Sequence, residues 1–166
     1  MLTILMEIRK SQDYGVLLLE ITKMLEADLD AVVALEASVF TLPWSRPLFL
    51  KDIKENKCAR FFTAKEGDKL LGYGGFWLLQ DEMNIVNIAV SPDHRQKGVG
   101  KLLLKHLLSE GMKEGAKFAT LDVRVNNTAA RKLYESAGFI FIALRKKYYT
   151  DNQEDAIVMW LNPIKL

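Results

Sequence analysis

The chain has 166 residues, of which 49% are hydrophobic and 27% charged, with a formal net charge of +2. This length suits one globular domain that needs no disulfide to stabilise it. The small net charge excludes nucleic-acid binding by bulk attraction, and no apolar run reaches the ~18–20 residues that cross a bilayer. The single cysteine, Cys58, excludes an internal disulfide and has no histidine at metal-ligand spacing. We therefore expect a cytoplasmic protein without a metal site.

The N-terminal segment, residues 1–15, is the part of the chain that the sequence describes least. Its first six residues are mildly apolar and charged residues follow at once, which is the reverse order of a secretory signal. The segment could be an extra strand, a disordered leader, or the product of an upstream start codon with Met6 as the true start. A single domain is expected over residues 16–166.

The first half of the chain predicts a strand, two helices and then three strands. Asp28 can cap the first helix, and Pro47 suits the first turn of the second. Gly67-Asp68 suits a hairpin turn, and three glycines over residues 72–75 suggest a bulge or a close backbone approach. The expected elements are a strand over 16–23, helices over 29–40 and 47–56, and strands over 59–66, 69–79 and 83–90.

A basic, glycine-bearing turn follows the last of these strands and opens into an amphipathic helix. The pattern is R-x-x-G-x-G at Arg95, Gly98 and Gly100, which is neither the P-loop nor the dinucleotide fingerprint. Free backbone amides at a helix N-terminus bind anions, and glycines let an anion approach closely. With Lys97 and Lys101 nearby, the expected guest is a phosphate group, and specifically a pyrophosphate. The alternative is a glycine-rich turn on a solvated basic face.

The second half of the chain predicts helices alternating with strands. The helix after the basic turn ends near Gly115, and Asn127 can cap a later helix that Gly138 terminates. The expected elements are a strand over 118–125, a helix over 128–137, and a closing hairpin of strands over 139–149 and 156–161. A meander of strands followed by this alternation indicates an α+β fold on a mixed sheet.

Several segments in this order resemble one known family. The basic turn resembles the coenzyme A pyrophosphate loop of the GNAT acetyltransferase superfamily, and the likeness extends from about Ile21 to Leu161. Within it, the chain resembles the RimI-like branch of ribosomal-protein N-alpha-acetyltransferases. The segments that carry this resemblance are Leu42-Pro43-Trp44-Ser45, Asn87-Ile88-Ala89-Val90, Asp122-Val123-Arg124, Leu133-Tyr134-Glu135-Ser136-Ala137-Gly138-Phe139, Arg145-Lys146-Lys147-Tyr148-Tyr149 and Glu154-Asp155-Ala156.

The resemblance implies a fold, a reaction and a cofactor. The implied fold is GNAT-like: a mixed, mainly antiparallel sheet of six to seven strands flanked by about four helices. In the implied reaction, a protein N-terminal amine attacks acetyl-CoA directly within a ternary complex. The implied acceptor is the N-terminal alanine of a small-subunit ribosomal protein, and no direct nucleic-acid or membrane partner is expected. The residues implied to bind acetyl-CoA are Ile88, Ala89, Val90, Arg95, Gln96, Lys97, Gly98, Val99, Gly100, Lys101, Asn127 and Tyr134, with the oxyanion donor near Ala89 or Val90.

Two residues are candidates for the proton transfers. Tyr134, seven residues after Asn127 and hence on the same helix face, is the expected acid for the departing thiolate; alternatively its ring only packs in the core. Asp122 stands where the family usually has glutamate and is the expected base, acting through one water. Alternatively it is an aspartate at a strand end that pairs with Arg124 or with nothing. Glu36 is the fallback carboxylate. A modest base suits an α-amine of pKa ~7.7–8 better than a lysine of ~10.4.

The resemblance also implies walls for a peptide groove, formed by Leu42, Pro43, Trp44, Tyr148 and Tyr149. Alternatively, Trp44 belongs to the core and the tyrosines form a strand-pair contact. The charge run over residues 145–147 could be a solvated strand face. Two other functions compete with N-terminal acetylation of a ribosomal protein. They are acetylation of another acceptor, such as a small amine or another protein N-terminus, and acetyl-CoA sensing without catalysis.

Overall fold

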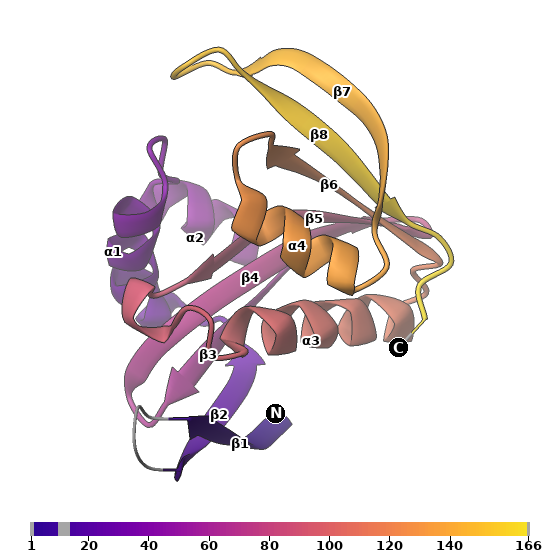
Figure 1. The fold of residues 1–166 in the computed structure, drawn as a ribbon. Coiled ribbons are helices and arrows are strands. Elements are labelled where there is room, and N and C mark those ends of the chain that lie inside the picture. Colours follow the sequence, from indigo (N-terminus) through magenta and orange to yellow (C-terminus); the bar gives the residue numbers. More distant parts are fainter. Residues whose placement is uncertain (1, 10–13, 166) are drawn as a thin grey trace.

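The computed structural model describes residues 2–9 and 14–165, with side chains from residue 18 onwards. The described residues form eight strands, four α-helices and two short 3-10 helices (Figure 1). Their order is β1 (Leu2–Arg9), β2 (Tyr14–Lys23), η1 (Glu26–Asp28), α1 (Leu29–Val39), α2 (Arg46–Lys54), β3 (Ala59–Glu66), β4 (Lys69–Leu79), β5 (Glu82–Val90), η2 (Pro92–His94), α3 (Val99–Lys113), β6 (Phe118–Arg124), α4 (Thr128–Ser136), β7 (Ile140–Tyr149) and β8 (Glu154–Leu161).

All eight strands form one sheet in the order β1-β2-β3-β4-β5-β6-β8-β7. Only β5 and β6 pair in parallel, and every other neighbouring pair is antiparallel. The expected α+β class and its mixed, mainly antiparallel sheet are confirmed. The sheet has one strand more than the six to seven expected, because β1 in the N-terminal segment pairs with β2. Residues 10–13 of that segment lie outside the described residues.

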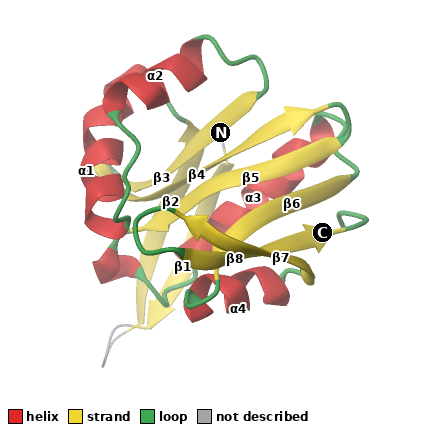
Figure 2. Ribbon diagram, turned by 90° about the horizontal axis from the view of Figure 1, so that it is seen from above, coloured by secondary structure: helices red, strands yellow, loops and turns green. Residues whose placement is uncertain are grey.

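Helices cover both faces of the sheet (Figure 2). Side chains of successive strand residues point to opposite faces, so neighbouring positions on β4 serve different layers. Tyr73 packs with α1 and α2 in one buried cluster, whereas Gly72 and Gly74 face α3. A methyl group on Gly72 would lie 3.1 Å from a Leu103 side-chain carbon and 2.7 Å from the Ala89 carbonyl oxygen. The close approach expected for this glycine-rich run is therefore confirmed, and it lets α3 lie directly on β4.

Most local signals of the sequence are realised. Gly67, at φ 55°, lies in the two-residue turn between β3 and β4, and the Asn127 side chain accepts the Ala130 amide at 3.1 Å to cap α4. Gly138, at φ 94°, ends that helix. The expected cap of α1 is wrong: the Asp28 carboxylate instead accepts the Leu25 amide at 2.8 Å, which closes the 3-10 turn before the helix. In the described part of the chain, no helix is both long and apolar enough to span a membrane.

Candidate functional site

The basic turn presents a row of unused backbone amides. Gln96 and Gly98 have positive φ angles of 59° and 85°, and alternating left-handed residues of this kind form anion-binding concavities. The first hydrogen bond of α3 runs from the Leu102 amide to the Gly98 carbonyl, at 3.1 Å. Among the described residues, the amides of residues 96–101 have no acceptor. Six consecutive backbone amides at the start of a fifteen-residue helix are therefore without an acceptor in the described part of the chain.

Positive charge surrounds these amides. Arg95, Lys97 and Lys101 are exposed, and none of them forms an ion pair with the described part of the chain. The Arg95 Nε lies 3.4 Å from the Val90 carbonyl oxygen, and the Lys97 Nζ lies 2.7 Å from the Asp93 carbonyl oxygen. Main-chain contacts thus hold Arg95 and Lys97 beside the turn, and all three cations keep their charge available for an anion.

Strands β5 and β6 separate beside this turn. Their parallel pairing runs from Glu82 and Phe118 to Ile85 and Leu121 and then ends, although both strands continue. A bulge lies at the same place, because Gly75 faces Asn87 while Phe76 faces Ile85, which leaves Val86 as the extra residue. Bulges of this kind bend a strand and end its pairing. The result is an opening between the two strand ends, next to the N-terminus of α3.

The hydrogen-bond alternation of β5 decides which amide enters the opening. The Ser91 amide donates to the Leu71 carbonyl of β4, at 2.8 Å. In an antiparallel ladder, every second residue is bonded to the same partner strand, so Ala89 also faces β4. The intervening residue, Val90, directs its amide and carbonyl away from β4 and toward the opening, where Arg95 reaches that carbonyl. Of the two expected donors, Val90 is therefore the one with a free amide.

The candidate acid and base approach the opening from opposite faces of the sheet. Tyr134 on α4 is 8% exposed and belongs to the core cluster beneath α3 and α4. Leu121 and Val123 of β6 point into that same cluster, so Asp122 between them faces the other side. Burial, with a smaller effect of Tyr149, raises the pKa of the Tyr134 hydroxyl well above its usual value, so this group stays protonated. A buried proton donor and a carboxylate thus flank one opening.

The candidate base has a partner that the sequence did not indicate. Asp122 does not pair with Arg124; its Oδ1 lies 3.1 Å from the Arg145 Nε of β7. The N–H of Arg145 does not point at this oxygen, which has no hydrogen-bond donor among the described residues. The contact is therefore a pairing of charges only, and this oxygen is enclosed without a hydrogen-bond donor.

Comparison with known proteins agrees with this geometry. A model of the acetyltransferase (GNAT) family matches residues 29–139. The chain belongs to the acetyltransferase (GNAT) family. It is accordingly an acetyl-CoA-dependent N-acetyltransferase, as the sequence predicts.

Several GNAT relatives and structures are similar to the chain over most of its length. The [ribosomal protein bS18]-alanine N-acetyltransferase of Escherichia coli (strain K12) is 36% identical over 148 residues, which are 88% of this chain and 98% of the relative. The crystal structure of the ribosomal-protein-S18-alanine N-acetyltransferase from Escherichia coli has a TM-score of 0.80 at 35% identity, over 89% of this chain and 95% of that chain. The structure of yncA from Salmonella typhimurium with its cofactor acetyl-CoA has a TM-score of 0.73 at 20% identity, covering 87% and 93% of the two chains.

The fallback carboxylate of this GNAT domain lies in a buried hydrogen-bond network. Glu36 is 1% exposed, and its Oε1 accepts the Trp44 amide at 3.0 Å. The Tyr73 hydroxyl donates to its Oε2, and the Asn87 Nδ2 lies 3.3 Å from that hydroxyl. Burial raises the pKa of the Glu36 carboxyl, while the Tyr73 and Trp44 donors oppose the rise. The network ties α1, the α1–α2 loop, β4 and β5 together at one point.

The expected walls of the peptide groove lie on two separate segments. Leu42 and Pro43, in the α1–α2 loop, are exposed, whereas the half-buried Trp44 ring packs 5.4 Å from that of Phe49. Trp44 thus has the core packing of the alternative interpretation. Tyr148 and Tyr149 form an edge-to-face pair at 5.3 Å beside an irregularity of β7. The first segment is the α1–α2 loop, which spans residues 40–45. The second segment is the end of β7 together with the β7–β8 turn that follows it, and the turn itself spans residues 150–153.

Arg124 is the polar residue of the site that sequence reasoning missed. It lies on β6 two residues after Asp122, and its guanidinium carbon is 3.8 Å from the centre of the Tyr149 ring. Its carboxylate partners, Asp151 and Glu154, are 27 and 30 residues away in the chain. The only available sequence signal was a charged residue in an otherwise alternating strand, which does not identify partners so distant.

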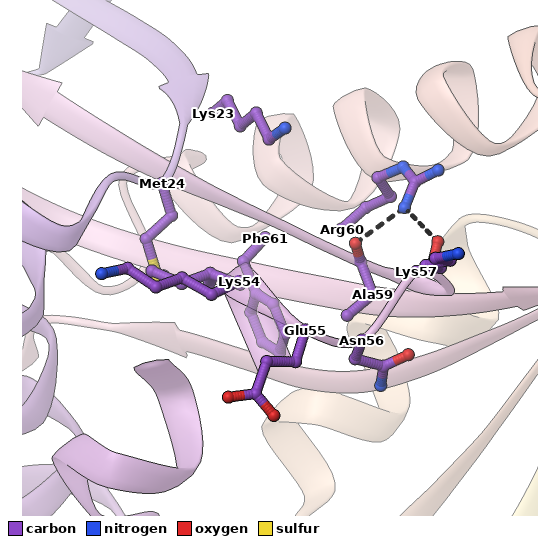
Figure 3. A pocket seen from close by; sticks show the side chains of 10 residues that line it. Lys23, Met24, Lys54, Glu55, Asn56, Lys57, Ala59, Arg60 and Phe61 are labelled. Atoms are coloured by element: carbon purple, nitrogen blue, oxygen red, sulfur yellow. Dashed lines mark hydrogen bonds between the residues drawn. The ribbon is translucent and has the colours of Figure 1, made fainter. Parts of the chain in front are cut away.

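A separate pocket lies at the opposite end of the sheet (Figure 3). This pocket is lined by the end of β2, the end of α2 and the start of β3. The opening between β5 and β6 lies at the other end of the sheet, where those two strands end. Arg60 at its edge donates to the Lys57 and Ala59 carbonyls and pairs with Glu114 at 2.7 Å. None of the predicted site residues lines this pocket.

Proposed function

We propose that this GNAT enzyme acetylates a protein N-terminus in the cytoplasm, and that its acceptor is the N-terminal alanine of ribosomal protein bS18. The observation that carries the proposal is the 36% identity, across 98% of the relative, to a protein named for that reaction. The free Val90 amide, the buried Tyr134 hydroxyl and the Asp122 carboxylate around one opening support it. The proposed acceptor is therefore a protein, and the proposal includes no direct nucleic-acid or membrane partner.

The residues of the opening fit acetyl-CoA. The six free amides of residues 96–101 would hold the pyrophosphate, with Arg95, Lys97 and Lys101 offsetting its charge. A side chain on Gly98 would be strained at φ 85°, and this strain supports a turn shaped for close backbone approach. The segment of β5 from Ile88 to Val90, beyond the end of its pairing with β6, and the Asn127 side chain complete the assigned cofactor contacts. Acetyl-CoA supplies a thioester that an amine can attack.

The proposal assigns one residue to each step of the reaction. Asp122 accepts the proton of the acceptor amine, directly or through one water. The Val90 amide donates a hydrogen bond to the thioester oxygen as negative charge develops on it. The Tyr134 hydroxyl gives its proton to the sulfur that leaves. Since Tyr134 approaches from the α3–α4 face and Asp122 from the other, the amine and the cofactor would enter from opposite sides of the sheet.

Arg145 limits access to the base. Its guanidinium lies against Asp122 while its side chain is 54% exposed, so it can swing into solvent at small cost. An acceptor amine that approaches Asp122 would displace this cation. Because like charges repel, Arg145 disfavours the approach of an ammonium group, and an α-amine of pKa ~7.7–8 is partly neutral in the cytosol.

The deciding experiment compares three peptides under correction for acetyl-CoA hydrolysis. One carries the N-terminal sequence of bS18 beginning with alanine, the second is the same peptide blocked at its α-amine with an internal lysine free, and the third begins with leucine. We expect mass spectrometry to find the acetyl group on the α-amine of the first peptide alone. Acetylation mainly on lysine, or on a small amine in place of peptides, would contradict the proposal. Tight acetyl-CoA binding without any transfer would indicate a sensor.

A further inference from the structure

Arg124 connects the two segments that the proposed acceptor would lie between. Its Nη2 atom is 2.8 and 2.9 Å from the two carboxylate oxygens of Asp151 in the β7–β8 turn. The same nitrogen lies 3.4 Å from the hydroxyl of Thr41 in the α1–α2 loop. The other terminal nitrogen donates to Glu154 at 3.2 Å and to Asn152 at 3.0 Å. One guanidinium therefore contacts both segments at once.

The two segments also contact each other at this point. The Thr41 hydroxyl donates to the Asp151 carboxylate, which joins the α1–α2 loop to the β7–β8 turn across 110 residues of sequence. The side chains of Arg124 and Asp151 are 24% and 16% exposed and Thr41 is an exposed residue, so the cluster lies at the protein surface. The Thr41 hydroxyl and Arg124 lower the pKa of Asp151, which stays ionised at neutral pH. We call Thr41, Arg124 and Asp151 the bridging cluster.

The α1–α2 loop is fixed at both ends. The bridging cluster holds Thr41 at its start, and Glu36 holds the Trp44 amide at its end. The two residues between, Leu42 and Pro43, are exposed. On the other side, Tyr149 is held by the stacking of its ring on Arg124. These contacts therefore set the separation between the Leu42-Pro43 wall and the Tyr149 wall.

We propose that Arg124 is a positioning residue that fixes the width of the acceptor groove and thereby restricts the first residue of the acceptor to a small side chain. This inference rests on the proposed function, because it needs an acceptor between these walls. An arginine suits the task since its planar, permanently charged group can contact two carboxylates and an aromatic ring together. A lysine keeps the positive charge but has neither the forked set of N–H donors nor a planar group that can stack on a ring.

The activity test uses Arg124→Lys, with Arg60→Lys as a matched control at the opposite end of the sheet. Arg60 also contacts a carboxylate and two backbone carbonyls, and its side chain is 30% exposed. For Arg124→Lys we expect the KM of the alanine peptide to rise about tenfold, the order expected for a lost charge-assisted contact in a partly exposed site. The KM for acetyl-CoA should stay within about twofold, and the preference for alanine over leucine peptides should fall. Arg60→Lys should leave all three unchanged.

A second measurement tests the bridge without any acceptor. Hydrogen exchange of Arg124→Lys should speed up in residues 40–45 and 150–153 together, and Asp151→Asn should reproduce this pattern. Exchange that rises in one segment only, or an unchanged peptide KM in a folded variant, would overturn the bridging role. If the wild-type enzyme acetylates no peptide, the proposed function fails and the acceptor role of Arg124 fails with it. Hydrogen exchange then still reports the coupling of the two segments.

Discussion

Replacing Tyr73 by phenylalanine tests whether the Glu36 network holds the acceptor side of the domain together. The change removes one hydroxyl and keeps the ring, which is fully buried and packs 5.6 Å from Phe49. The Glu36 Oε2 then loses its donor at a site that is 1% exposed. Leaving a buried charged acceptor unpaired costs about 2–3 kcal/mol. For a chain of this length, this cost corresponds to a fall in Tm of about 4–12 °C.

The pH dependence of this loss identifies its cause. Burial already raises the pKa of Glu36 above its usual value, so the stability associated with this group is fully present at low pH and falls as pH rises through the folded-state pKa. Without the Tyr73 donor that pKa rises further, because the hydrogen bond had favoured the charged form. The free-energy difference between wild type and Tyr73→Phe should therefore be larger at pH 8 than at pH 5.

Urea unfolding at the two pH values measures both effects, with Glu36→Gln as the control. The glutamine has the same shape, cannot ionise, and can still accept the Trp44 amide through its carbonyl oxygen. In the Glu36→Gln background, Tyr73→Phe should cost less, about 1 kcal/mol, and its cost should not depend on pH. A loss below about 0.5 kcal/mol at pH 8 in the wild-type background, or an equal loss at both pH values, would refute the reasoning.

Four further predictions concern the cofactor and the chemistry. Gly98→Ala and Gly115→Ala place alanine at φ angles of 85° and 101°, at the two ends of α3. Each variant should therefore lose about 1 kcal/mol of stability. Calorimetry should show weaker acetyl-CoA binding, by at least about tenfold, for Gly98→Ala alone. Tyr134→Phe should lower kcat by about 10²-fold with little change in the KM for acetyl-CoA; a wild-type kcat would leave this residue as packing only. The wild-type kcat should not decline up to about pH 9.5 through loss of the Tyr134 proton, because burial raises the pKa of that hydroxyl. Asp122→Glu should keep activity. The kcat/KM defect of Asp122→Asn should shrink between pH 7 and 9, because the α-amine of the acceptor becomes neutral there without a base. A defect that persists at pH 9 would assign Asp122 to positioning of the amine.

Sequence alone determined the features that depend on near neighbours in the chain. The turn from Arg95 to Gly100, the Asn127 cap and the hairpin at Gly67 each follow from a few adjacent residues whose backbone preferences and side-chain donors act locally. The same holds for the fold class and the family, since both rest on short segments in a fixed order. Asp28 marks the limit of this kind of inference: its side chain had two local amides within reach, and the sequence could not rank them.

The tertiary structure decided every feature that depends on register or on distant partners. A single extra residue at Val86 sets which β5 amides face the opening, so that Val90 and not Ala89 has the free donor, and a one-residue shift would reverse this. Asp122 meets Arg145 and Arg124 meets Asp151 because β6, β8 and β7 are neighbours in the sheet. Such pairings are fixed by the packing of the whole sheet, and local preferences of the chain carry no information about them.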